Sequence, residues 1–308
     1  MKKVLVTGSA GFLGKKVVLD LLKNNFAVTG VDIKESHIIH PHFMEIIGDI
    51  RTISIEEEIS TIIHLASVMN PPKGMNDGEI ESIEIDGLKN LINIFKEHGT
   101  EKFIFTSSGA AYGYTKRNLK PLVESDDVLG DIYFPYSKHK AESEKILRSK
   151  LESKELVILR PSTILGAGMK GPIYDYFSKK MIVGVKSYDS PFCFIHTDDV
   201  VSAITQSSIK ENLYGTFNLA GDGALSLKEC CQILKTTHLR VPKIALKTGI
   251  HLLKKFRLTQ YHPYQVDFMC YRPVLNNEKL KKNFEGLPSK SSEEVFLEFC
   301  SDELNQKN

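Results

Sequence analysis

The stretch Lys2-Lys3-Val4-Leu5-Val6-Thr7-Gly8-Ser9-Ala10-Gly11-Phe12-Leu13-Gly14 decides the fold of this chain. Residues 2–7 have the composition of a short buried strand. Apolar residues then recur at helical spacing from residue 13 to about residue 24. A strand, a glycine-rich turn and a helix in this order predict the first unit of an α/β protein with a parallel sheet.

The three glycines of this turn have separate physical roles. Gly8 permits a tight turn, and Gly11 lets the backbone approach a pyrophosphate at the helix N-terminus. Gly14 allows the helix to pack closely on the strand. The sequence therefore predicts a dinucleotide-binding turn, and a helix packed on a strand without any ligand is the alternative interpretation.

The second strand indicates which dinucleotide is bound. The predicted strand 27–32 ends at Asp32, where a carboxylate accepts hydrogen bonds from the adenosine ribose. Because a carboxylate repels a 2′-phosphate, Asp32 favours NAD over NADP. NADP stays open as an alternative because three cations lie nearby: Lys15, Lys16 and Lys34.

Strand and helix patterns alternate through the first half of the chain. Strand-like runs occupy residues 2–7, 27–32, 61–66, 102–106 and 156–160, and helical patterns occupy 13–24, 79–98 and 134–151. This alternation predicts a doubly wound parallel sheet with helices on both faces. Ligands bind beyond the carboxyl ends of such strands, so residues at those ends should converge on one crevice.

Tyr136 and Lys140 form a candidate proton-transfer pair. The run from residue 134 to about 151 is rich in Ala, Glu, Lys and Leu and predicts a helix. Residues four apart lie on one helix face, about 5–6 Å apart at Cβ. An ammonium group in that place favours phenolate, so we expect Lys140 to lower the pKa of Tyr136 toward working pH.

Further motifs follow in a fixed order. They are Gly48-Asp49-Ile50-Arg51, His64-Leu65-Ala66-Ser67, Phe105-Thr106-Ser107-Ser108-Gly109-Ala110-Ala111-Tyr112-Gly113, Arg160-Pro161 and Phe194-Ile195-His196-Thr197-Asp198-Asp199-Val200. With the glycine turn, they resemble the extended short-chain dehydrogenase/reductase family, in its NAD-dependent epimerase/dehydratase group that includes UDP-glucose 4-epimerase. The resemblance implies a Rossmann-type core (1–165 with 191–220) and a smaller C-terminal substrate-binding lobe (166–190 and 221–308).

The resemblance also implies hydride transfer at a secondary alcohol or ketone of a sugar or sugar nucleotide. Ser108, Tyr136 and Lys140 would be the catalytic residues, with Tyr136 as the acid/base. The implied cofactor-binding residues are Gly8, Gly11, Phe12, Leu13, Gly14, Asp32, Ile33, Asp49, Ile50, Leu65, Ala66, Ser67, Thr106, Tyr136, Lys140 and Pro161. No metal is expected, because no ligand stands at metal-binding spacing from the loop histidines His37, His40 and His42.

Three positions depart from the family pattern. Thr163 replaces a usual Asn and Phe192 a usual Arg, both expected on a diphosphate, and Glu84 replaces a common Asn. Candidate replacement cations are Arg117, Lys170, Lys179, Lys180 and Arg272. A dehydrogenase or ketoreductase for a more apolar alcohol or ketone is the alternative, for which Phe192, Phe194, Met169 and Tyr174 would suit the substrate loop. A non-catalytic NAD-binding regulator is the alternative from another class.

Composition limits the partners. The 308 residues are 42% hydrophobic with a net charge of +2, which allows a large core and gives nucleic-acid binding little support. No apolar run is long enough to span a bilayer, and the first strand leaves no room for a signal peptide. Five cysteines without a metal or pairing pattern fit reduced thiols. We expect a cytoplasmic enzyme with a small-molecule substrate and no membrane or nucleic-acid partner.

Two predicted helical regions could serve either the core or an intermolecular contact. The amphipathic run 243–256 is expected to be buried against the core, with contact to a membrane or a hydrophobic substrate as the alternative. A homodimer through residues 79–98 and 134–151 is implied by the resemblance. The apolar residues that would serve either a core or that interface are Ile80, Ile83, Leu91, Ile94 and Phe95.

Overall fold

A parallel sheet of seven strands, counted over the residues described below, is the centre of the computed structural model. Its order is β10-β6-β5-β4-β1-β2-β3, which confirms the predicted Rossmann-type α/β fold. The strands are β1 (Lys3–Thr7), β2 (Ala27–Asp32), β3 (Phe43–Ile47), β4 (Thr61–His64), β5 (Lys102–Thr106), β6 (Leu156–Pro161) and β10 (Gly215–Leu219). The structure describes residues 1–69, 71–72, 74–169, 171–189, 191–256, 258–259 and 262–306, with side chains as far as residue 301.

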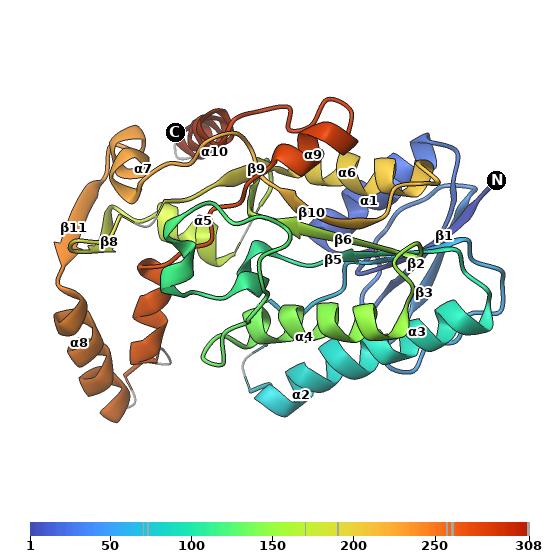
Figure 1. Ribbon diagram of the computed structural model, residues 1–308, viewed down its shortest axis with the longest axis horizontal. Coiled ribbons are helices and arrows are strands. Elements are labelled where there is room, and N and C mark those ends of the chain that lie inside the picture. The colour runs from blue at the N-terminus through green and yellow to red at the C-terminus, as the bar shows by residue number, and fades with distance from the viewer. Residues whose placement is uncertain are drawn as a thin grey trace.

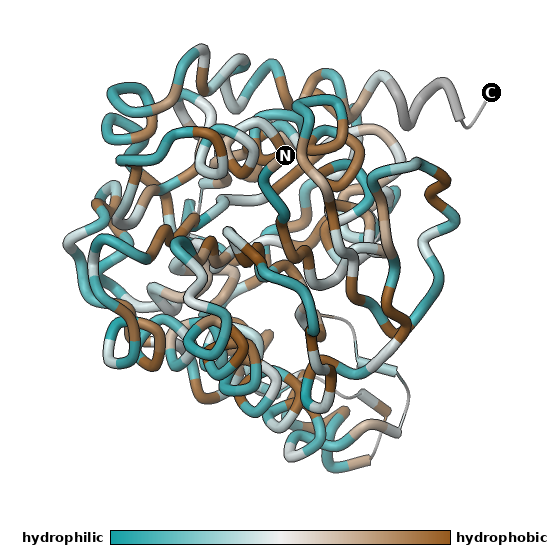
Figure 2. Tube along the Cα trace, turned by 90° about the vertical axis from the view of Figure 1, so that its right-hand side faces the viewer, coloured by the Kyte–Doolittle hydropathy of each residue, from teal (hydrophilic) through white to brown (hydrophobic). Residues whose placement is uncertain are grey.

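Helices cover both faces of the sheet (Figure 1). One face carries α1 (Phe12–Lys23), α6 (Thr197–Ile209) and the short α9 (Glu278–Asn283). The opposite face carries α2 (Asp77–Glu81), α3 (Gly87–Glu97) and α4 (Pro135–Lys150). Successive side chains of a strand alternate between these layers, so Val4 and Val6 join one core cluster and Leu5 joins the other. Hydrophobic segments accordingly concentrate in the interior, between the two layers of helices (Figure 2).

Two elements of the core differ from the sequence prediction. Strand β3 was not predicted, because it is an edge strand whose Met44 and Ile47 are exposed and it shows no clear alternation. The helix predicted over 79–98 is interrupted by a π-helical segment, η1 (Ser82–Asp86), between α2 and α3. Such π-segments frequently occur at functional sites.

The segments predicted to form a smaller lobe lie in the second half of the chain. They contain β8 (Met181–Val185) paired with β11 (Thr237–Val241), and α5 (Pro172–Phe177), α7 (Leu227–Ile233) and α10 (Ser292–Gln306). β7 (Thr163–Leu165) pairs with β9 (Phe194–His196) beside it. The division into two lobes stays a prediction, and within its C-terminal range Leu280, Phe284 and Leu287 pack with the core layer of α1 and α6.

The aromatic residues expected near the substrate loop have a different role. Phe192 is 2% exposed and Phe194 is 0% exposed, and their rings stack at 5.6 Å. Together with Phe177 and Phe296 they form the core of the smaller lobe. Phe194 therefore stabilises the lobe rather than lining a substrate pocket, and Met169 and Tyr174 pack against the same cluster.

Helix α8 (Lys243–Lys255) does not follow its prediction either. Leu246 and Ile250 do pack against the lobe, but no residue of the helix is fully buried. Ile244 is 81% exposed and Phe256, directly after the helix, is 69% exposed. The expected burial against the core is therefore wrong for the outer face of this helix, which projects from the lobe at the left of Figure 1.

Among the described residues, no helix has both the length and the apolar character needed to cross a membrane.

Candidate active site

The site lies where the sheet changes its winding direction. Strands β1 and β4 are neighbours, but the chain leaves β1 toward β2 and continues from β4 toward β5, on opposite sides. The crevice at the carboxyl ends of such strands is the usual ligand site of this fold class. The two strand ends touch, because a Cβ added to Gly8 would lie 2.8 Å from the Ala66 backbone nitrogen. Leu65 and Ser67 flank that contact.

Two positions of the glycine turn, Gly8 and Gly14, leave no room for a side chain. Gly8 has a φ of 73°, which L-residues with a side chain rarely adopt. A Cβ on Gly14 would lie 1.9 Å from the Gly8 carbonyl oxygen, so helix α1 approaches the turn in contact with it. The backbone of Gly11 continues into α1 as its N-cap, where unpaired backbone N–H groups can face an anion.

Asp32 lies at the end of β2 beside this turn. Its carboxylate accepts hydrogen bonds from the backbone N–H groups of Ala10 and Lys34, both at 3.1 Å. The side chain of the next residue, Ile33, is 70% exposed, and Phe12 at the start of α1 is 39% exposed. The structure thus joins the carboxylate directly to the glycine turn.

Asp49 follows β3 and pairs with a neighbour. Arg51 approaches it at 2.5 Å, and this hydrogen-bonded cation lowers the pKa of the Asp49 carboxyl. Ile50 is 7% exposed and packs into the core, against Gly87 of α3. The buried Ile50 side chain is therefore not available to a ligand, whereas the Asp49 carboxylate is partly exposed.

Ser108, Tyr136 and Lys140 come together from two elements. Ser108 follows β5, and its hydroxyl accepts the Ala110 N–H at 3.1 Å while bonding the Tyr136 hydroxyl. Tyr136 and Lys140 lie on α4, whose first residue is a proline suited to a helix start. Lys140 is 2% exposed and donates to the Thr106 carbonyl at 3.2 Å.

The acid/base properties of this triad differ from the sequence expectation. In the protein alone, burial raises the pKa of Tyr136 to about 12, although the Ser108 hydrogen bond opposes the change. Burial also lowers the pKa of Lys140, so the buried ammonium is itself disfavoured. The expected lowering of the Tyr136 pKa by Lys140 is thus wrong for the chain by itself. A bound positive charge would favour the phenolate.

Glu84 is a further member of the site. It is 4% exposed within the π-helical segment η1, and its carboxylate accepts hydrogen bonds from the Ser67 hydroxyl at 2.7 Å and the Val68 N–H at 2.5 Å. Its charge raises the pKa of both Tyr136 and Lys140. The sequence showed this residue only as a departure from a pattern, because no sequence periodicity reveals that a glutamate is buried.

A buried ion pair fixes α4 on the sheet. Arg160 of β6 donates two hydrogen bonds to Glu144 of α4, at 2.9 and 2.6 Å, and both side chains are almost fully buried. Ser107 donates to the same carboxylate at 2.6 Å. The network ties the strand end that carries Ser108 to the helix that carries Tyr136, and Pro161 ends β6 beside Gly109.

The space next to Tyr136 is aromatic and has one partly buried cation. Phe134 contacts Tyr136 at 5.9 Å between ring centroids, and Phe268 contacts both Phe134 and Tyr114. Arg272 stacks 3.9 Å over the Phe192 ring and interacts with the Tyr114 hydroxyl. Of the other cations considered, Arg117, Lys179 and Lys180 are exposed, and Lys170 lies outside the described residues.

The donors present fit a dinucleotide. Ser9 in the glycine turn and Thr106 beside Lys140 each have a buried hydroxyl without a hydrogen-bond partner. Lys140 offers further N–H donors besides its one bond to Thr106. Buried polar groups are normally satisfied, so the Thr106 hydroxyl is a candidate contact for a polar ligand near Tyr136. The Ser9 hydroxyl lies against Gly30 of β2 instead. Within the described residues, no group of three or more potential metal ligands occurs.

A doubly wound sheet with a glycine turn at its switch point defines a dinucleotide-binding α/β protein. The chain matches the family model "NAD dependent epimerase/dehydratase family" over residues 4–220. It therefore belongs to the NAD-dependent epimerase/dehydratase family and is an enzyme of that family.

Individual relatives are distant and carry different activities. A dTDP-4-dehydro-6-deoxyglucose reductase of Escherichia coli is 26% identical over 280 residues, 80% of this chain and 85% of the reductase. A 3-beta-hydroxysteroid dehydrogenase of Mycolicibacterium neoaurum is 26% identical over 63% of this chain and 58% of its own. The solved UDP-N-acetylglucosamine 4-epimerase of Methanobrevibacter ruminantium M1, in complex with UDP-N-acetylmuramic acid, has a TM-score of 0.74 at 21% identity, covering 99% of both chains.

Proposed function

We propose that this protein is an NAD-dependent oxidoreductase or epimerase that acts at a secondary alcohol or ketone of a sugar or sugar nucleotide. The observation that carries the proposal is the buried triad of Ser108, Tyr136 and Lys140 beside the switch point of the sheet. The reductase and the solved epimerase are both named after a sugar linked to a nucleotide, which supports a sugar or sugar nucleotide as the substrate class. Arg272 supplies one cation that can pair with a phosphate group of such a substrate.

The roles of the chain's own residues follow from their contacts. NAD, when bound, exchanges a hydride with the carbon that bears the reacting oxygen. Tyr136 takes the proton from that oxygen or returns it, and Ser108 holds the same oxygen in place. Lys140, with N–H donors to spare, would bind ribose hydroxyls. The glycine turn and the N-terminus of α1 would hold the pyrophosphate.

We propose NAD rather than NADP as the cofactor. The Asp32 carboxylate lies beside the glycine turn, where it accepts two backbone N–H groups and keeps lone pairs for ribose hydroxyls. A 2′-phosphate in the same place would put two anions side by side.

The decisive experiment removes the Tyr136 hydroxyl. Tyr136→Phe should lower turnover by about 10²–10⁴-fold, because the proton donor and acceptor is lost, while NAD still binds. Turnover is measured by chromatography of products from a panel of sugar nucleotides, and NAD binding by calorimetry. Tyr133→Phe is the matched control, since its hydroxyl lies outside the triad. Equal turnover in Tyr136→Phe and in the unmodified protein would contradict the proposed role of Tyr136.

A second candidate is a dehydrogenase or ketoreductase for a more apolar alcohol. It is favoured by the aromatic rings of Tyr114, Phe134 and Phe268 beside Tyr136, and by the steroid dehydrogenase among the relatives. The two candidates differ in cofactor balance. An epimerase leaves the nicotinamide absorbance unchanged at the end of the reaction, whereas stoichiometric NADH formation from added NAD identifies the dehydrogenase.

A further inference from the structure

Helix α8 has two apolar faces, although only one of them packs on the protein. Leu246 and Ile250 face the lobe and contact the cluster of Val185, Val266 and Tyr271. Ala245, Gly249, Leu252 and Phe256 recur at the spacing of a second stripe along the helix. Leu252 is 50% exposed and Phe256 is 69% exposed, so this outer stripe faces solvent.

The remaining side of the helix is basic. The helix carries four lysines and no carboxylate in its sequence Lys243–Lys255. Lys243 and Lys247 pair with Asp267 of η4 (Pro263–Met269), at 2.6 and 3.1 Å. No Asp or Glu in the described part of the chain lies within ion-pair distance of Lys254 or Lys255. At about 100° per residue, Lys255 lies about 60° from Leu252 around the helix, so the outer apolar stripe borders one uncompensated positive charge. Lys254 lies on the opposite side of the helix, close enough to affect His262 of the pocket.

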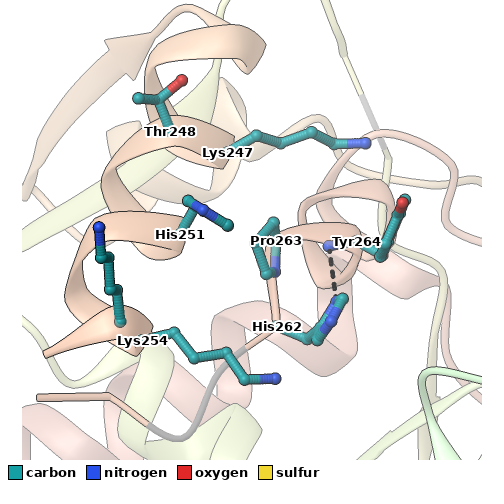
Figure 3. A pocket seen from close by; sticks show the side chains of 8 residues that line it. Lys247, Thr248, His251, Lys254, His262, Pro263 and Tyr264 are labelled. Carbon is teal, nitrogen blue, oxygen red and sulfur yellow. Dashed lines mark hydrogen bonds between the residues drawn. The ribbon is translucent and has the colours of Figure 1, made fainter. Parts of the chain in front are cut away.

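An open pocket of about 790 Å³ separates this basic side of the helix from η4. In Figure 3, Lys247 and His251 on α8 face Pro263 and His262 across this space. Burial and the positive charges of Lys254 and His251 lower the pKa of His262. The pocket is thus lined by groups that repel cations and suit an anionic headgroup.

We propose that α8 and η4 form a peripheral docking surface for an anionic lipid membrane. The outer stripe of α8 enters the interface between headgroups and acyl chains, and Lys255 contacts a lipid phosphate beside it. Lys254 adds positive charge from the side of the pocket. Apolar residues on one side of a helix and lysines on its flank are the composition of helices that lie in a membrane interface. Contact with a membrane is the alternative that the amphipathic run 243–256 left open in the sequence.

The surface is connected to the candidate active site through η4. On its outer side, Tyr264 stacks on Tyr133 with ring centroids 4.3 Å apart. On its inner side, Phe268 contacts Phe134 at 4.9 Å, and Phe134 contacts Tyr136. Residues 133–136 thus run directly from the docking surface to the candidate acid/base.

The test is co-sedimentation of the full chain with vesicles of phosphatidylcholine, alone or mixed with phosphatidylglycerol. The bound fraction should rise with the anionic lipid and fall with added salt. Leu252→Ser with Phe256→Ser should lower the partition coefficient roughly tenfold or more. Ile39→Ser with Leu119→Ser, which changes exposed apolar residues elsewhere, is the matched control and should bind normally.

A charge-reversal pair tests the electrostatic part. Lys254→Glu with Lys255→Glu should abolish the dependence on phosphatidylglycerol, whereas Lys145→Glu with Lys150→Glu on α4 should preserve it. Thermal unfolding confirms that each variant is folded, which their exposure leads us to expect. Absence of vesicle binding, or equal losses in the controls, would overturn the proposal. A change of oligomeric mass in Leu252→Ser with Phe256→Ser, without vesicle binding, would assign the surface to a second copy of the chain instead.

Discussion

At the scale of single residues, the candidate site depends on charges that are buried together. Tyr136 has a raised pKa and Lys140 a lowered pKa, because burial opposes the charged form of each. Glu84 adds a carboxylate that disfavours phenolate and favours ammonium. The protein alone therefore keeps the proton on Tyr136, and the ligands must supply the remaining driving force for its transfer.

Glu84→Gln should lower the pKa of both Tyr136 and Lys140, because the negative charge that raises both values is removed. The phenolate absorbance of Tyr136, obtained by subtracting the titration of Tyr136→Phe, should appear at lower pH. In the unmodified protein the folded-state pKa of about 12 exceeds the ordinary 10.0. The stabilisation from Tyr136 is therefore complete below pH 10 and is lost as pH rises toward 12.

The matched control for this change is Glu81→Gln, one turn earlier, whose half-exposed carboxylate pairs with Lys138 of α4 at 3.1 Å. It removes the same charge from the same part of the chain but leaves the hydrogen bonds to Ser67 and Val68 in place. A shift of equal size in Glu81→Gln, or no shift in Glu84→Gln, would contradict the assigned role of Glu84.

At the scale of elements, close approach of helix and strand positions the site. Helix α1 meets the glycine turn so closely that no side chain fits at Gly14. The ion pair of Arg160 and Glu144 fixes α4 on the sheet in the same way, but through charge and hydrogen bonds. Both contacts hold helices at the carboxyl ends of the strands, where the site residues lie.

Gly14→Ala should destabilise the fold by about 1–3 kcal/mol, because the added methyl group overlaps the Gly8 carbonyl and forces α1 to move. The displaced turn should also bind NAD more weakly, as calorimetry would show. Gly249→Ala in α8 is the control, since a Cβ there meets nothing within 4 Å. It should stabilise the protein by about 0.5–1 kcal/mol in urea unfolding. Equal stability of the two variants would contradict the steric argument.

At the scale of the whole molecule, the site residues gather at the carboxyl ends of strands that belong to one parallel sheet. The proposed homodimer gains no support from its apolar residues, because Ile80, Leu91, Ile94 and Phe95 are all 5% exposed or less. They belong to the monomer's own core. The outer face of α3 presents Lys89, Asn93 and Lys96 instead.

NAD binding should stabilise the whole fold against heat, because only the folded chain brings the strand ends together. At about 100 times the dissociation constant the gain is about 2.7 kcal/mol, or several degrees in melting temperature. NADP at the same concentration should give a smaller shift. Asp32→Ala should reduce the difference between the two cofactors, while Asp127→Ala, an exposed carboxylate, should leave it unchanged. An equal shift with both cofactors in the unmodified protein would contradict the role of Asp32.

Local pattern was sufficient for much of the fold. The glycine turn and Asp32 at the end of β2 were predicted from short-range rules, and the structure places Asp32 beside that turn. Strand β3 and the short pair β8 and β11 escaped prediction because exposed or short strands show no clear period. The π-helical break at Ser82–Asp86 escaped because the apolar pattern there continues that of a regular helix.

The sequence by itself determined the α/β class, the place of the dinucleotide turn and the identity of the residues at the strand ends, because each depends on neighbours close in the chain. Only the tertiary structure decided that Glu84 is buried beside Tyr136, that Phe192 and Phe194 form a core, and that α8 exposes a second apolar stripe. Burial is a property of segments distant in sequence, and it alone determines whether a charge shifts a pKa or an apolar side chain meets solvent.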